Sequence, residues 1–162
     1  MSEFDLRTFL PYLLNQAAEE TSLGFSRVYK DRYGMLRTEW RVLFHLGRYG
    51  DMTAAEIGRR AKMHKTKISR AVAALEAKRF VTRREDSADR RRETLTLSAQ
   101  GRRAFDDLVV VAEAHDTRLT ANLSAGERAV LIDCLQRLAG FGNGVERALS
   151  PAIDGYKQDE YQ

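Results

Sequence analysis

The residues Thr53-Ala-Ala-Glu56 constrain the fold of this chain most, because they fix the start of a short helix. They form a capping box, in which the Thr hydroxyl and the Glu carboxylate each accept a hydrogen bond from the other residue's backbone N–H. We expect this helix to run to about Ala61. A break at residues 62–64 then precedes a second helix that reaches about Lys78. Two short helices joined by a tight turn are a helix-turn-helix pattern.

The second helix has two distinct faces. With about 100° between successive residues, its apolar side chains fall on one side: Ile68, Ala71, Val72 and Leu75. The opposite side carries small, hydroxyl-bearing and cationic residues: Thr66, Lys67, Ser69, Arg70 and Ala73. Such a face suits the DNA major groove, where small residues allow close approach and Arg can bind a guanine edge. A plain amphipathic surface helix would show the same two faces.

A predicted β-hairpin follows directly. Residues 80–85 and 92–98 are rich in β-branched and aromatic residues at alternate positions, and the polar segment 86–91 between them contains arginines. Guanidinium groups at a hairpin tip suit a narrow, electronegative minor groove. The helix and this wing together favour duplex binding more than either does alone. The fold class we predict is mainly α with a small β-hairpin wing, a winged helix-turn-helix.

The charge distribution emphasises the same segment. Residues 53–103 contain fifteen Lys and Arg against six Asp and Glu, a net charge of +9, whereas the rest of the 162-residue chain carries −5. A concentrated positive field favours a polyanionic partner. Charge by itself would fit a solvated basic surface equally well.

The segment from Leu36 to Gly101 resembles the MarR (multiple antibiotic resistance regulator) family of winged helix-turn-helix transcription regulators. The resemblance rests on three stretches: LRTEWRVLFHL, TAAEIGRRAKMHKTKISRAVAALEAKRFVTR and the wing DSADRRRETLTLSAQG. With the flanking helices it covers roughly residues 8–147. It implies a homodimer held by the N- and C-terminal helices, which presents two winged lobes to a pseudo-palindromic operator on double-stranded DNA. His64 stands where many relatives cap the recognition helix with Asp or Ser.

The resemblance also implies roles for the wing. Arg91 would enter the minor groove, Asp89 would orient it through a charge-assisted contact, and Arg90 would meet a phosphate. On the helix we expect base contacts from Thr66, Lys67 and Arg70. Phosphate contacts are expected from Lys65, Arg83 and Arg84.

The remaining helices provide material for a dimer interface. We expect a helix over residues 10–33, a second one capped by Thr38, a long one after Ser98, and one opened by the capping box Ser124-Ala-Gly-Glu127. Their apolar stripes exceed what a small winged lobe needs to cover itself. The predicted organisation is an N-terminal dimerisation helix (1–35), the DNA-binding lobe (36–100), C-terminal dimerisation helices (101–150) and a disordered tail (151–162).

Many members of the family are repressors that a small aromatic or phenolic ligand releases from DNA. An aromatic wall and a cation for a carboxylate could come from five residues: Tyr12, Arg27, Trp40, Arg41 and His45. The sequence is equally consistent with Trp40 as a core residue and with Arg41 as one member of a structural ion pair. His45 and His115 lie among apolar positions, where a hydrogen-bonded core histidine is expected.

Other classes of protein fit less well. No run of about 18 apolar residues exists, and the segment MSEFDLRTF lacks the basic and apolar regions of a secretory signal, so we expect a cytoplasmic protein. A single cysteine, Cys134, leaves no internal disulfide or Cys-based zinc site. The sequence contains no catalytic motif, and we expect neither enzymatic activity, nor a cofactor, nor a metal. The competing interpretation is a non-sensing architectural or non-specific nucleic-acid-binding protein.

Overall fold

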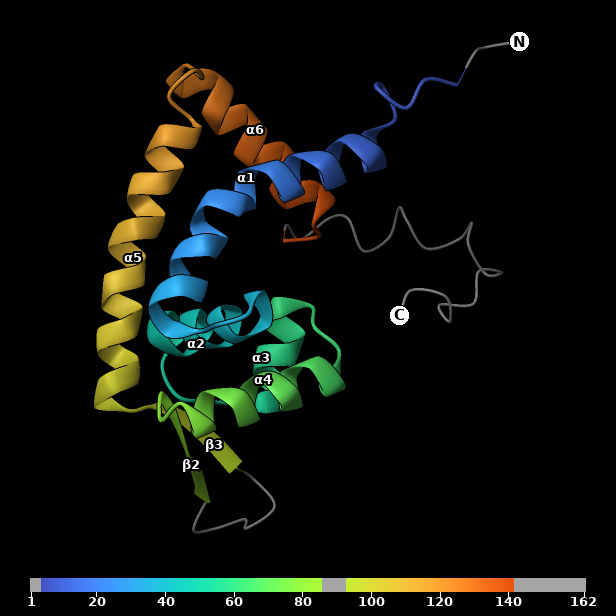
Figure 1. Ribbon diagram of the computed structural model, residues 1–162. Helices are drawn as coiled ribbons and strands as arrows, with labels where there is room; N and C mark the ends of the chain where they lie inside the picture. Colours follow the sequence, from blue (N-terminus) through green and yellow to red (C-terminus); the bar gives the residue numbers. More distant parts are fainter. Residues whose placement is uncertain (1–3, 86–92, 142–162) are drawn as a thin grey trace, which may run out of the picture. The chain divides into compact units, whose positions relative to one another are not determined.

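The computed structural model describes residues 4–85 and 93–141, and its backbone forms two compact units, Met1–Thr117 and Arg118–Gln162. The first unit contains most of the helices and all described strands (Figure 1). In chain order the elements are α1 (Leu10–Tyr33), α2 (Arg37–Tyr49), β1 (Met52–Thr53), α3 (Ala54–Ala61), α4 (Lys65–Ala77), β2 (Val81–Glu85), β3 (Glu93–Leu97), α5 (Ala99–Leu119) and α6 (Ala125–Leu138). The mainly helical fold with a small wing is confirmed.

The core of the first unit lies where α2, α3 and α4 meet the sheet. Its most completely buried side chains are Met35, Val42, Leu43, Leu46, Ile57, Ile68, Val72, Leu75 and Leu95. These residues come from the loop before α2 and from α2, α3, α4 and β3. The two short helices are therefore held mainly by shared apolar burial, the dominant favourable term in folding. Figure 1 shows the hairpin of β2 and β3 extending from this helical layer beyond α4.

The wing is a three-stranded antiparallel sheet in the order β1-β3-β2. In the hairpin Arg83 lies opposite Leu95, and on the other side of β3 Thr53 lies opposite Thr94. The periodicity of residues 80–85 and 92–98 predicted β2 and β3, whereas no pattern predicted β1. Since β1 consists of only Met52 and Thr53, it has no periodicity by which a strand could be recognised.

The predicted helix starts are confirmed except one. The Thr53 backbone N–H donates to Glu56 Oε2 (2.7 Å) and the Glu56 N–H donates to Thr53 Oγ1 (3.2 Å), as a capping box requires. The prediction that Thr38 caps α2 is wrong. The N-cap is Leu36, two residues earlier, and no side chain caps this end. The Leu36 carbonyl accepts from the N–H groups of Glu39 and Trp40, so Thr38 is already helical.

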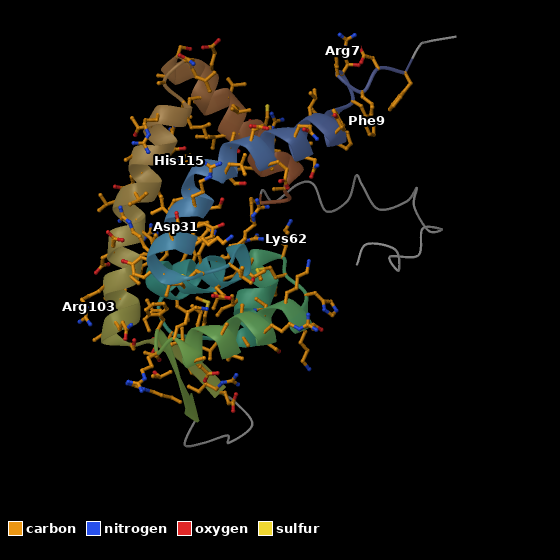
Figure 2. The ribbon with its side chains drawn as sticks, viewed as in Figure 1. Arg7, Phe9, Asp31, Lys62, Arg103 and His115 are labelled. Carbon is orange, nitrogen blue, oxygen red and sulfur yellow. The ribbon has the colours of Figure 1, made fainter. Side chains whose placement is uncertain are left out.

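Polar contacts join α1 to α5 within the first unit. Arg32 Nη1 lies 2.9 Å from Asp107 Oδ1, and the Tyr33 hydroxyl donates to Asp107 Oδ2 at 2.7 Å. Figure 2 shows His115 where α5 faces α1, and its Nε2 lies 2.8 Å from the Thr21 carbonyl oxygen. The expected hydrogen-bonded histidine is therefore found.

The start of α5 packs against the start of the wing at very short range. The Ser98 N–H donates to the Phe80 carbonyl at 3.0 Å, and the Ser98 hydroxyl accepts from the Gly101 N–H at 2.9 Å. A Cβ built on Gly101 would lie 2.0 Å from the Phe80 carbonyl oxygen. Only glycine fits this approach without a backbone shift.

In the second unit, α6 begins with the predicted capping box, since Ser124 Oγ accepts from the Glu127 N–H. No residue of α6 is buried, and its exposed apolar side chains are Val130, Leu131, Ile132, Leu135 and Leu138. Among the residues that the structure describes, no helix is both long and apolar enough to cross a bilayer.

Candidate nucleic-acid interface

The two predicted faces of α4 are confirmed. Ile68, Val72 and Leu75 are at most 2% exposed, whereas Thr66, Lys67 and Arg70 lie on the solvent side. Within residues 4–85 and 93–141, the side chains of Thr66, Lys67 and Arg70 make no hydrogen bond or ion pair. A helix face with two unpaired cations and a hydroxyl is free to bind anionic and polar groups.

The N-terminal end of α4 is capped by an unusual residue. His64 Nδ1 accepts from the Thr66 N–H at 3.3 Å, so the imidazole caps this end of the helix. Beside it lies an open groove of about 770 Å³, bounded by the first turn of α3, by Lys65 and Ser69 of α4, and by Glu93 of β3. This flank of the helix is therefore accessible from solvent.

The two arginines of β2 differ in their surroundings. Arg83 Nε donates to Glu76 Oε1 at 2.8 Å, and Arg83 Nη1 donates to Glu93 Oε2 at 2.5 Å. The hydrogen bonds to Glu76 and then Glu93 hold the pKa of Arg83 above its ordinary value. Arg84 is exposed and has no such partner among the described residues. The residues predicted for the wing tip, Asp89, Arg90 and Arg91, lie outside the described residues.

The structure adds exposed cations beyond those predicted from the sequence. Arg59 and Arg60 are exposed on α3, and the Arg60 guanidinium lies 4.9 Å from the centre of the Tyr49 ring. Lys62, in the turn between α3 and α4, adopts a left-handed conformation with φ of 49° (Figure 2). The charge excess of residues 53–103 was the signal that could have identified Arg59 and Arg60.

The residues predicted for an effector do not form one cluster. Trp40 packs against Phe25 at a ring distance of 5.1 Å and is half-buried, while Arg41 Nη2 donates to the Ala61 carbonyl at 2.9 Å. His45 Nδ1 lies 2.7 Å from the Arg41 carbonyl oxygen. Tyr12 lies 13 residues before Phe25 on the same helix, about 20 Å along its axis.

Arg27 is exposed on α1. Trp40 packs against the core, as the alternative interpretation expected. For Arg41 that alternative expected an ion pair, but the partner is the Ala61 backbone carbonyl rather than an acid. No group of three or more His, Cys, Asp or Glu that could hold a metal ion occurs within the described parts of the chain.

Comparison with known proteins places this lobe in a family. The model of the MarR family matches residues 33–92. The HTH-type transcriptional regulator YdgJ of Bacillus subtilis (strain 168) is 26% identical over 113 residues, which are 70% of this chain and 69% of that protein.

Solved structures extend the match to most of the chain. A MarR/EmrR family transcriptional regulator from Acinetobacter sp. ADP1 superposes with a TM-score of 0.76 at 22% identity, covering 85% of this chain and 97% of that one. Bordetella bronchiseptica BpsR, whose DNA binding is regulated by 6-hydroxynicotinic acid, superposes equally well at 18% identity, covering 85% and 98%. The DNA-binding lobe thus matches the MarR family, and the chain has the fold of MarR-family winged helix-turn-helix transcriptional regulators.

Proposed function

We propose that this regulator is a homodimeric repressor that binds a pseudo-palindromic operator and is released by a small aromatic acid. The main support for operator binding is the exposed face of α4. On this face the side chains of Thr66, Lys67 and Arg70 have no hydrogen-bond or ion-pair partner among the described residues. In a winged helix-turn-helix this helix lies in the major groove. Lys65 and Arg84 then lie on exposed positions suited to phosphates.

Selection of operators from random duplex DNA tests this proposal. We expect a consensus with two related half-sites. Arg70→Ala should weaken binding to that consensus by about 1–3 kcal/mol and relax the preference at one base position. Lys30→Ala, which removes an exposed charge from α1, is the matched control and should change neither. Equal losses on consensus and random duplex would contradict base contact by Arg70, and the absence of any consensus would favour a non-specific architectural protein.

The dimer is proposed from the apolar residues left exposed. On α1 these include Leu10 and Leu13, which are 50% and 41% exposed, and on α6 they include Val130, which is 64% exposed. Apolar surface exposed along a helix in this way marks an interaction site. Light scattering should give twice the protomer mass. Leu131→Glu should lower that mass and Gln136→Glu, an exposed polar position on the same helix, should not; a monomeric parent protein would refute the dimer.

The effector proposal is supported by BpsR, whose DNA binding is regulated by 6-hydroxynicotinic acid, and by aromatic residues at the α1–α2 contact of this chain. Trp40, Arg41 and His45 are the nearest candidates for its site, while Tyr12 and Arg27 would have to contribute from elsewhere on α1. A thermal-shift screen of aromatic acids, including 6-hydroxynicotinic acid, should yield a stabilising compound that weakens operator binding. Stabilisation with unchanged operator affinity would refute release by that compound, because an effector must bind the two states differently.

A further inference from the structure

One guanidinium links three elements of the DNA-binding lobe. Arg83 extends from β2 and uses two different edges of its planar group, Nε toward Glu76 on the last turn of α4 and Nη1 toward Glu93 at the start of β3. The side chains of Glu76, Arg83 and Glu93 are 30%, 40% and 46% exposed. We call these three residues the Arg83 bridge.

The strand register explains why these groups meet. Arg83 lies opposite Leu95, so Glu93, two residues earlier on β3, is its diagonal neighbour on the same face of the sheet. Glu76 belongs to α4, the helix that precedes β2, and lies seven residues before Arg83. The Arg83 bridge therefore ties the inclination of the wing to the C-terminal end of the recognition helix.

Each ion pair of the bridge contributes little to global stability, because exposed ion pairs contribute at most about 1 kcal/mol. Their geometry matters more, since a guanidinium held at two edges by separate carboxylates has a fixed orientation. The same two contacts neutralise the cation. A phosphate approaching Arg83 would meet two carboxylates as well as the guanidinium.

Arg84 provides the contrast within the same strand. It is the next residue, it lies opposite Thr94, and it has no ion pair within residues 4–85 and 93–141. The two arginines are equal in formal charge, so variants of the two differ only in the contacts that are lost.

We propose that Arg83 is a positioning residue for the wing, which holds the wing at the angle that the operator requires, and that it contributes no phosphate contact. This inference rests on the proposed function, since it assumes that helix and wing bind one duplex together. It replaces the phosphate contact that the sequence suggested for Arg83, while Arg84 keeps that role.

The decisive variant is the double substitution Glu76→Gln and Glu93→Gln. It raises the net charge of the lobe by two, keeps the side-chain shapes and frees the Arg83 guanidinium. A phosphate-binding Arg83 would then bind operator more tightly. A positioning Arg83 predicts the reverse, a loss of about tenfold on operator, within the usual range of coupling between linked elements, with random duplex bound at least as well as before.

Single variants give a second readout. Arg84→Ala should reduce the slope of log K against log salt by about 0.9, as expected for one lost phosphate contact. Arg83→Ala should leave that slope unchanged and lower the preference for operator over random duplex. Arg83→Lys should fail to restore it, because one ammonium cannot span two carboxylates in this arrangement. Far-UV circular dichroism and the urea midpoint establish that each variant is folded.

The outcomes separate the two levels of the proposal. Tighter operator binding by the double Gln variant, or a reduced salt slope in Arg83→Ala, would overturn the positioning role while leaving the operator model intact. A parent protein without preference for any operator would overturn the proposed function itself.

Discussion

The close approach of α5 to the wing predicts an unusual response to Gly101→Ala. In most helices this change stabilises, since Gly is about 0.8–1.0 kcal/mol less favourable than Ala in a helix interior. Here the new Cβ would lie 2.0 Å from the Phe80 carbonyl oxygen and 2.9 Å from the carbonyl carbon. Because real Cβ contacts are essentially never shorter than 3.0 Å, the backbone must separate by about an ångström.

The expected loss of stability can be estimated from the packing and the hydrogen bond that this backbone separation disturbs. Overpacking of a rigid site costs about 1–3 kcal/mol. The hydrogen bond from the Ser98 N–H to the same Phe80 carbonyl contributes about 1 kcal/mol and would be weakened. After the helical gain of about 1 kcal/mol is subtracted, Gly101→Ala should lower the free energy of unfolding by about 1–3 kcal/mol.

Gly126 provides a control in the same chain. It lies in the first turn of α6, as Gly101 does in α5, and a Cβ built there has no neighbour within 4 Å. Gly126→Ala should therefore be neutral or stabilise by up to about 1 kcal/mol. Urea unfolding at one fixed protomer concentration measures both variants, because oligomer stability depends on concentration. If Gly101→Ala were as stable as the parent protein, the steric argument would be refuted.

Three further predictions concern polar contacts of the first unit. Lys78→Met should lower the free energy of unfolding by about 1–3 kcal/mol, because Glu39, whose side chain is 5% exposed, loses its 2.7 Å ion pair. The loss is smaller than for a fully buried ion pair because the Lys78 side chain is 30% exposed. Urea unfolding equal to that of the parent would contradict this. Thr53→Ala should cost about 1 kcal/mol by removing a helix cap and Thr53→Ser should recover most of it, which thermal unfolding can check. Hydrogen bonds from Tyr33 and then Arg32 hold the pKa of Asp107 below its usual 3.8, so this carboxylate stabilises the fold above pH 4 and the effect is lost as the pH falls through its lowered pKa. The difference in unfolding free energy between the parent and Asp107→Asn should therefore shrink below pH 4, and a constant difference would refute the assignment.

The helix starts could be predicted where a capping box exists, because the cap and its partner lie only three residues apart. Thr53 and Ser124 are examples. Thr38 shows the limit of the same rule, since α2 begins at a residue without a polar side chain and its first carbonyl is Leu36. The strand β1 was missed because its pairing with β3 is a tertiary contact. The faces of α4 were predictable from the helical period, and the exposed Thr66, Lys67 and Arg70 follow from it.

The partners of individual cations could not be predicted in this way. Both Arg83 and Arg84 belong to a basic strand, and their sequence context does not indicate that carboxylates from α4 and β3 converge on only one of them. The effector residues illustrate the same limit over a longer range. Tyr12 and Trp40 have suitable chemistry, but 13 residues of α1, about 20 Å along the helix, separate Tyr12 from the Phe25 ring against which Trp40 packs.

The double role of Thr53 affects how the DNA-binding lobe can unfold locally. It is at once the last residue of β1, paired with Thr94 of the wing, and the residue that caps α3. A two-stranded hairpin by itself is only marginally stable in water, and separating the hairpin from β1 here also releases the residue that caps α3. We therefore expect local unfolding of the wing to be coupled to fraying of α3, so that the backbone amides of both elements share one opening free energy in hydrogen exchange.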